Sequence, residues 1–243
     1  MDHARIAELL EPFLSTVPNP YHAERSQRRS EEPVAILSGT LLKDISTYID
    51  LLLRWNARIN LTAIRDPEEI VTRHFGESLF AARRLFPVGA ALGTAAPGGA
   101  AKPSSTVHVA DLGSGAGFPG IPIKLWAPHV SMTLIESNQK KATFLREVVR
   151  SLRLTDIDIQ HIRGEDLLQT YDVVTLRAVE RFTEALLVAA RLLAPNGRLA
   201  LLIAASQTDD ALLAIPRFTW EDPIPIPQSS SRLLLMSDPV SMQ

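Results

Sequence analysis

A glycine-rich turn directly after an apolar segment constrains the fold of this chain more than any other feature. Residues 107–112 predict a buried strand, and glycines follow at positions 113, 115, 117 and 120. A helix is predicted to begin at residue 120, so the glycines connect a strand to a helix. Glycines let the backbone approach a ligand closely, and a helix N-terminus offers unpaired N–H groups. The pattern therefore predicts a ligand site at a strand's carboxyl end in an open α/β sheet.

Strands and helices alternate through most of the second half of the chain. Strands are expected at 107–112, 131–136, 157–162, 171–176 and 198–204, with helices at 120–126, 138–152 and 181–193. This alternation predicts a parallel, doubly wound sheet. Two late strands, at 217–226 and 232–237, have no helix between them, so we expect an antiparallel hairpin at the sheet edge.

The first half of the chain is predicted to be helical, with helices at 4–14, 34–55 and 66–86. Asp66-Pro67-Glu68-Glu69 is typical of a helix start, because Asp caps the helix and Pro suits its first position. A basic loop is expected at 15–32, and the Ala-, Gly-, Pro- and Ser-rich residues 87–105 predict a flexible linker or an insertion. We therefore expect a helical N-terminal part at 1–86, the linker at 87–105 and an α/β domain at 106–243.

Composition excludes several classes of site. The chain has 243 residues and no cysteine, so disulfides, Cys-ligated zinc, iron–sulfur clusters and a Cys nucleophile are excluded. The lack of cysteine suits a reducing cytosol, and no metal site is expected. The N-terminus lacks the pattern of a signal peptide, and no segment is apolar enough to span a membrane, so we expect a cytoplasmic location. The net charge of −2 gives no global basic field for nucleic acid.

The glycine turn is compatible with two cofactor classes. Gly115, Gly117 and Gly120 match the dinucleotide pattern G-x-G-x-x-G, and Glu136 lies about 20 residues beyond it, as that pattern requires. A nicotinamide-dependent oxidoreductase is therefore an alternative. Against it, the match begins two residues late, and Pro119 lies where the helix should offer N–H groups to a pyrophosphate.

The frame Asp111-x-Gly113-x-Gly115-x-Gly117 resembles motif I of the S-adenosylmethionine-dependent methyltransferases. That resemblance implies an α/β fold of the Rossmann-like methyltransferase type, with a seven-stranded sheet, an antiparallel last strand and here a small helical N-terminal part. Asp111 and the glycines would then face the amino-acid end of the cofactor. Glu136 is similar to the acid that accepts hydrogen bonds from the ribose hydroxyls, although a helix-capping role is the alternative.

Several segments resemble one family more closely. These segments, which lie between about residues 45 and 200, are RWNARINLTAI at 54–64, RHFGESL at 73–79, VADLGSGAGFPGIP at 109–122 and IESNQKKATFL at 135–145. Together they resemble the RsmG (GidB) family of bacterial 16S rRNA guanine-N7 methyltransferases. The resemblance implies S-adenosylmethionine as cofactor, N7 of a guanine as methyl acceptor, and 16S rRNA of the small ribosomal subunit as partner, with the enzyme expected to be a monomer.

The resemblance also implies particular site residues. Gly113 and Phe118 belong to the implied cofactor pocket, Gly164 and Glu165 would lie near the adenine, and Arg177 would position cofactor and substrate. The chain departs from the family pattern in three places. Glu77 stands where the family usually has Asp, Ile203-Ala204 stands where it usually has a Lys-Gly pair, and residues 87–105 are longer than expected.

The expected chemistry requires alignment and no general base. Guanine N7 carries a free lone pair and no proton at neutral pH, so an in-line methyl transfer depends on positioning and electrostatics. His74 is open to two interpretations, as a contact to RNA or cofactor and as a buried core histidine. Alternatives to the proposed activity are a methyltransferase acting on another substrate and a non-catalytic RNA-binding module.

Basic residues indicate a possible RNA face despite the near-zero net charge. Those expected to contact RNA are Arg54, Arg58, Arg73, Lys140 and Lys141. A solvated charged surface is the alternative interpretation, because charge runs usually have that role.

Overall fold

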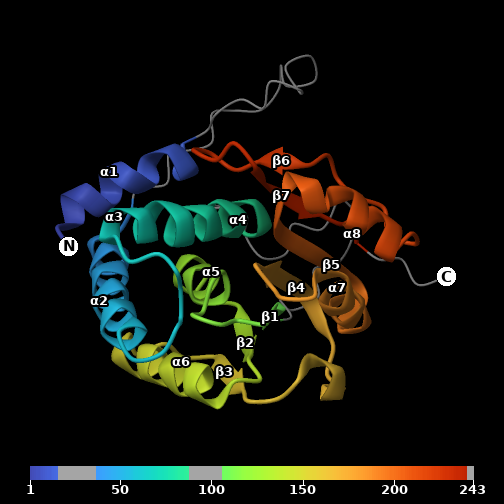
Figure 1. Ribbon diagram of the computed structural model, residues 1–243, viewed down its shortest axis with the longest axis horizontal. Coiled ribbons are helices and arrows are strands. Elements are labelled where there is room, and N and C mark those ends of the chain that lie inside the picture. The colour runs from blue at the N-terminus through green and yellow to red at the C-terminus, as the bar shows by residue number, and fades with distance from the viewer. Residues whose placement is uncertain (16–36, 88–105, 240–243) are drawn as a thin grey trace, which may run out of the picture.

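A seven-stranded mixed sheet forms the centre of the computed structural model, which describes residues 1–15, 37–87 and 106–239 (Figure 1). The spatial order is β3 (Ile157–Gln160), β2 (Ser131–Ile135), β1 (His108–Leu112), β4 (Tyr171–Arg177), β5 (Leu193–Ala204), β7 (Arg232–Met236) and β6 (Ile224–Pro225). The strands from β3 to β5 are parallel, while β7 pairs antiparallel with both β5 and β6. The predicted parallel sheet and its antiparallel terminal hairpin are therefore confirmed.

Helices cover both faces of the sheet. One face carries α1 (His3–Leu14), α2 (Gly39–Asn56), α4 (Glu77–Leu85), α5 (Gly120–Trp126) and α6 (Gln139–Ser151). The other carries α7 (Phe182–Arg191) and α8 (Thr208–Ala214). Strand β1 shows how the faces are separated, because Val109 packs with the first group and Ala110 with the second, as strand alternation requires.

The N-terminal helices share a core with the sheet. Ile45 and Leu52 of α2 and Phe75 are fully buried together with Val109 and Leu134. In Figure 1 the blue and cyan helices lie on the side of the molecule that α5 and α6 also occupy. Residues 1–15 and 37–87 thus pack as one body with the α/β part. The loop expected at 15–32 and the linker expected at 87–105 lie outside the described residues, apart from their first positions.

A π-helical segment interrupts the helix predicted at 66–86. Asp66 caps α3 (Pro67–Glu69), its Oδ1 accepting a hydrogen bond from the Glu69 N–H at 2.8 Å. The π-helical η2 (Ile70–Gly76) follows, and α4 continues from it. At Gly76 a Cβ would come within 2.6 Å of the Phe13 ring, so only glycine lets α1 pack this closely. π-Segments are frequent at functional sites, and this one carries Arg73 and His74.

The region after residue 204 differs from its prediction. The strand expected at 217–226 is wrong for most of its length, because only Ile224–Pro225 form a strand, with one isolated bridge from Trp220 to Ser237. Prolines at 216, 223, 225 and 227 explain this, since they offer no N–H to a ladder. The prediction also missed α8 and the 3₁₀ turn η4 (Ala205–Gln207). Asp209 and Asp210 in the first turn of α8 were an available signal, since acids favour a helix N-terminus.

The described part of the chain holds neither a membrane-spanning helix nor a cluster of metal ligands. None of its helices is both long and apolar enough to cross a membrane. Within the same residues, His, Asp and Glu side chains form no group of three that could hold a metal ion.

Candidate active site

A pocket of about 430 Å³ lies at the carboxyl ends of β1, β2 and β4, which is where open α/β sheets bind ligands. Of the residues predicted to bind cofactor, Gly113, Glu136, Gly164 and Glu165 line it. Lys141, predicted to contact RNA, also lies in its wall. The volume falls within the ordinary range for small-molecule sites. The pocket thus brings together predicted cofactor-binding residues that are up to 52 positions apart in the chain, from Gly113 to Glu165.

The glycine turn passes between the pocket and the helical part of the core. Gly113 lines the pocket with a φ of +73°, and Gly117 has a φ of +88°, both in the region that favours glycine. A Cβ on Gly117 would overlap the hydroxyl of Tyr48. Gly113 therefore faces the pocket, whereas Gly117 allows helix α2 to approach the turn.

Glu136 connects the turn to the pocket wall. Its Oε2 accepts a hydrogen bond from the Gly115 N–H at 2.8 Å, and its Oε1 accepts one from the Asn138 N–H at 2.6 Å. Each carboxylate oxygen has capacity for a further hydrogen bond, and the side chain borders the pocket. Two backbone N–H groups thus hold the Glu136 carboxylate in place. The carboxylate can still accept hydrogen bonds from two hydroxyl groups of a ligand.

Asp111 lies beneath the turn and is absent from the pocket lining. Its Oδ2 accepts from the Gly120 N–H at 3.1 Å, and its Oδ1 accepts from the Thr175 hydroxyl at 2.8 Å. Burial raises the pKa of Asp111 to about 6, against the opposing effect of these hydrogen bonds. In this structure its carboxylate ties β1 to the start of α5 and to β4.

Phe118 is held by rings from the N-terminal helices. It stacks on Tyr48 at a centroid distance of 5.2 Å and on His74 at 4.8 Å. The Tyr48 hydroxyl donates to the Ala116 carbonyl inside the turn. Phe118 is 4% exposed and does not line the pocket. The helical part therefore holds one side of the turn whose other side borders the pocket.

Arg177 forms part of a buried cluster around Glu77, beside the pocket. Its Nη2 donates to the Glu77 carboxylate at 3.1 Å and to the Arg73 carbonyl at 2.7 Å. The Arg177 side chain is 9% exposed and the Glu77 side chain 2%. The structure thus places the Arg177 guanidinium against Glu77 and outside the residues that line the pocket.

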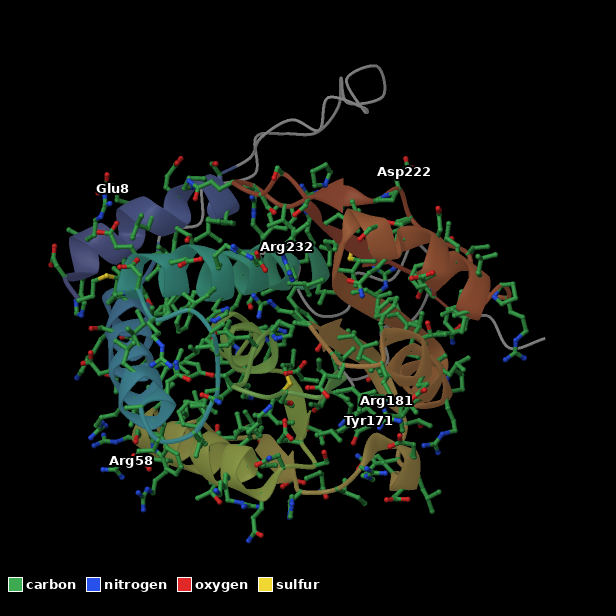
Figure 2. The ribbon with its side chains drawn as sticks, in the orientation of Figure 1. Glu8, Arg58, Tyr171, Arg181, Asp222 and Arg232 are labelled. Carbon is green, nitrogen blue, oxygen red and sulfur yellow. The ribbon has the colours of Figure 1, made fainter. Side chains whose placement is uncertain are left out.

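Two more arginines complete this cluster. Arg73 contacts Glu77 at 3.3 Å, and Arg232 of β7 contacts it at 3.0 Å. Figure 2 shows Arg232 beside α4, the helix that Glu77 begins. Arg232 pairs in the sheet with Ala204, the position where the family pattern has a Lys-Gly pair. Sequence reasoning missed Arg232, because no local pattern connects it to a carboxylate more than 150 residues earlier.

His74 is a buried core histidine in this structure. Its Nδ1 lies 3.1 Å from Arg177 Nη2, which can only donate, and its Nε2 lies 2.8 Å from the Thr62 hydroxyl. Burial and neighbouring arginines lower the pKa of His74 to about 3. We therefore assign a neutral imidazole that accepts at Nδ1 and donates at Nε2, with neither nitrogen left to act as a base.

Neutral His74 should make the fold less stable in acid. The unfolded chain binds a proton near the ordinary pKa of 6.5, whereas the folded chain does so only near 3, so stability is lost as pH falls between these values. Between pH 7 and pH 5 we expect a loss of about 2 kcal/mol from this residue. Urea denaturation of wild type and His74→Gln at both pH values measures it. An unchanged pH slope in the variant would contradict the assignment.

The predicted RNA-contacting residues lie at different places. Arg54 and Arg58 are exposed at the end of α2, and Lys140 is exposed in the first turn of α6. Helices α2 and α6 are joined by a hydrogen bond from Trp55 Nε1 to Glu147 at 3.0 Å. Figure 2 shows Arg58 at this corner. Arg73 differs from these residues, since it belongs to the Glu77 cluster.

Comparison with known proteins agrees with this architecture. A family model described as rRNA small subunit methyltransferase G matches residues 41–90 and 96–221. The chain is 38% identical over 189 residues to a protein of that name from Xylella fastidiosa (strain 9a5c), covering 76% of this chain and 80% of the relative. It is 37% identical to the Desulfitobacterium hafniense (strain Y51) protein over 185 residues, covering 73% of this chain and 70% of the relative.

A solved structure supports the fold. The ribosomal protein L11 methylase of Lactobacillus delbrueckii subsp. bulgaricus superposes with a TM-score of 0.54 at 15% identity, covering 69% of this chain and 80% of that one. The predicted Rossmann-like methyltransferase fold is confirmed by this match and by the sheet order. The family model spans well over half of the chain, and the chain therefore belongs to the GidB family of rRNA small subunit methyltransferases G.

Proposed function

We propose that this chain transfers a methyl group from S-adenosylmethionine to N7 of a guanine in the 16S rRNA of the small ribosomal subunit. The observation that carries the proposal is a pocket at the ends of β1 and β2, lined by Gly113 and Glu136, in a chain of the methyltransferase G family. We also propose that the enzyme is a monomer, as the family resemblance implies. Its substrate would place it in the cytoplasm.

The pocket residues suit this cofactor. Glu136 is a buried carboxylate at the pocket wall, and carboxylate oxygens are well suited to accept from two vicinal ribose hydroxyls. Gly113 would face the amino-acid end, while Gly164 and Glu165 would lie near the adenine. When bound, the cofactor supplies an activated methyl group on a sulfonium. The fixed turn and Glu136 would orient it without a large rearrangement.

The remaining site residues support positioning rather than proton transfer. Guanine N7 needs no deprotonation before it attacks a methyl group. His74 has both ring nitrogens engaged, and Asp111 accepts from Gly120 and Thr175. We propose that Arg177, fixed by Glu77, orients the guanine-binding side of the site. Asp111, Gly115, Gly117 and Phe118 would maintain the shape of the turn from outside the pocket.

RNA binding is proposed for the basic corner formed by α2 and α6. Replacing Arg54 and Arg58 together with glutamine should raise the KM for ribosomal subunits several-fold, because two phosphate contacts are lost. The slope of log affinity against log salt should fall by roughly 2. Binding at several salt concentrations measures both effects. An Arg198→Gln control, paired with Glu221 at 3.4 Å, should match wild type. An unchanged salt slope in the double variant would exclude this corner as an RNA-binding surface.

The proposed activity is tested with labelled S-adenosylmethionine and small subunits from a strain that lacks the modification. We expect label on one 16S guanine, at N7, after mapping of the modified base. Label on another RNA or on protein would support methyl transfer but would contradict 16S rRNA as the substrate. A thermal shift with a nicotinamide cofactor and none with S-adenosylmethionine would instead favour the oxidoreductase alternative.

A further inference from the structure

One guanidinium holds the turn that forms the outer wall of the pocket. Arg191, in the last turn of α7, donates from Nη1 to the Leu167 carbonyl at 3.0 Å. Its Nη2 donates to the carbonyls of Gly164 and Glu165, each at 2.8 Å. Three carbonyls of the segment 164–167, which includes the 3₁₀ turn η3 (Gly164–Asp166), thus accept hydrogen bonds from a single side chain.

The segment 164–167 has few other anchors. Within its backbone, the Leu167 N–H donates to the Gly164 carbonyl at 3.3 Å, and the Asp166 N–H donates to the Arg163 carbonyl at 3.1 Å. Glu165 and Asp166 are exposed, and the next residue, Leu168, is 90% exposed. Gly164 and Leu167 are the buried members. A short turn with so few contacts depends strongly on each hydrogen bond that fixes it.

The segment 164–167 forms part of the wall of the proposed cofactor pocket. Gly164 and Glu165 line the pocket, and so does Val188, one helical turn before Arg191 on α7. A Cβ on Gly164 would come within 2.5 Å of Leu112 and 3.0 Å of Val188, so the turn and α7 are in close contact. A shift of the turn would therefore change the pocket wall directly.

The strand order indicates which part of the cofactor this wall contacts. The order β3-β2-β1 places the segment after β3 beyond Glu136, on the side away from the glycine turn after β1. If Glu136 binds the ribose, as the proposed function has it, the base extends toward the segment 164–167. We propose that Arg191 is a positioning residue for the adenine side of the S-adenosylmethionine site. This inference rests on the proposed function.

The chemistry of the side chain supports this role. Arginine carries donors in a rigid planar fork, whereas lysine has one compact ammonium on a flexible chain. Among the described residues, Arg191 forms no ion pair with a carboxylate, and its guanidinium hydrogen bonds go to this segment. A guanidinium used in this way fixes backbone geometry rather than balancing a charge.

The test measures S-adenosylmethionine binding to the full chain by calorimetry, without RNA. Arg191→Met removes every donor but keeps an aliphatic chain, and we expect it to weaken binding about tenfold. Arg191→Lys, which keeps the charge and part of the donor set, should recover part of this loss. Arg198→Met is the matched control, since Arg198 pairs with Glu221 and does not line the pocket. It should bind like wild type.

Kinetics separate positioning from general destabilisation. In Arg191→Met the KM for S-adenosylmethionine should rise about tenfold, with unchanged kcat at saturation and unchanged KM for ribosomal subunits. The inhibition constant of adenosine should rise by the same factor, because the adenine side carries the defect. Amide hydrogen exchange should accelerate at 164–167 and remain unchanged in β1 and β4.

Other outcomes of these measurements would overturn the role of Arg191 or the proposed function. Wild-type affinity in a folded Arg191→Met variant overturns the inference, and so does an equal loss in the Arg198→Met control. If Arg191→Met does not fold, Arg191→Lys decides, and wild-type affinity for both cofactor and adenosine in that variant overturns the inference. Failure of the wild-type chain to bind S-adenosylmethionine would instead refute the proposed function.

Discussion

Replacing Glu77 with glutamine is expected to destabilise the fold by about 3–5 kcal/mol. The Glu77 side chain is 2% exposed and contacts Arg73, Arg177 and Arg232 within 3.3 Å. Removing its charge leaves three guanidiniums close together, with Arg177 almost wholly out of water. The energetic cost arises mainly from this uncompensated buried charge, which is why an isosteric side chain does not prevent it.

Urea denaturation at neutral pH measures the effect of Glu77→Gln. The matched control is Glu69→Gln, because Glu69 also faces Arg73, at 3.8 Å, but is 49% exposed. An exposed pair of this kind contributes at most about 1 kcal/mol. If both variants lose the same small amount of stability, the cluster does not support the fold as described. The family usually has Asp at this position, and Glu77→Asp should lose less stability than Glu77→Gln because it keeps the negative charge.

Replacing Glu136 with alanine is expected to weaken S-adenosylmethionine binding at least a hundredfold. Two ligand hydroxyls would lose a charged acceptor, and each such hydrogen bond contributes about 1.5–3 kcal/mol. The Gly115 and Asn138 N–H groups would also lose their partner, so the turn would no longer be fixed for the cofactor. The effect should therefore exceed that of any other single change in the pocket wall.

Calorimetry with the unmodified and variant chains tests this expectation. Glu136→Gln should be intermediate, because its amide oxygen still accepts one backbone hydrogen bond. Glu147→Ala is a suitable control, since Glu147 of α6 accepts a hydrogen bond from Trp55 of α2 and lies outside the pocket lining. Tight binding by Glu136→Ala would show that the pocket takes its ligand without this carboxylate.

Local patterns account for most of the fold. The alternation of apolar strands with helices from 107 to 204 predicts the parallel sheet, because each element's pattern reflects whether it is buried on one face or two. The strand predicted at 217–226 fails for most of its length, because prolines at 216, 223, 225 and 227 limit the pairing to Ile224–Pro225. Glycine spacing and Glu136 likewise located the pocket, because both lie at the ends of adjacent parallel strands.

The fold class, the glycine turn and the acid beside it could therefore be predicted from local patterns, since these features depend on residues near one another in the chain. The three-dimensional packing was needed to show that Arg177 contacts Glu77, one hundred positions earlier, together with Arg232. The same packing places His74 between Arg177 and Thr62, and Arg191 against the segment 164–167. Such contacts depend on how distant elements pack, and a charged residue's neighbours in space leave no periodic signal in its sequence surroundings.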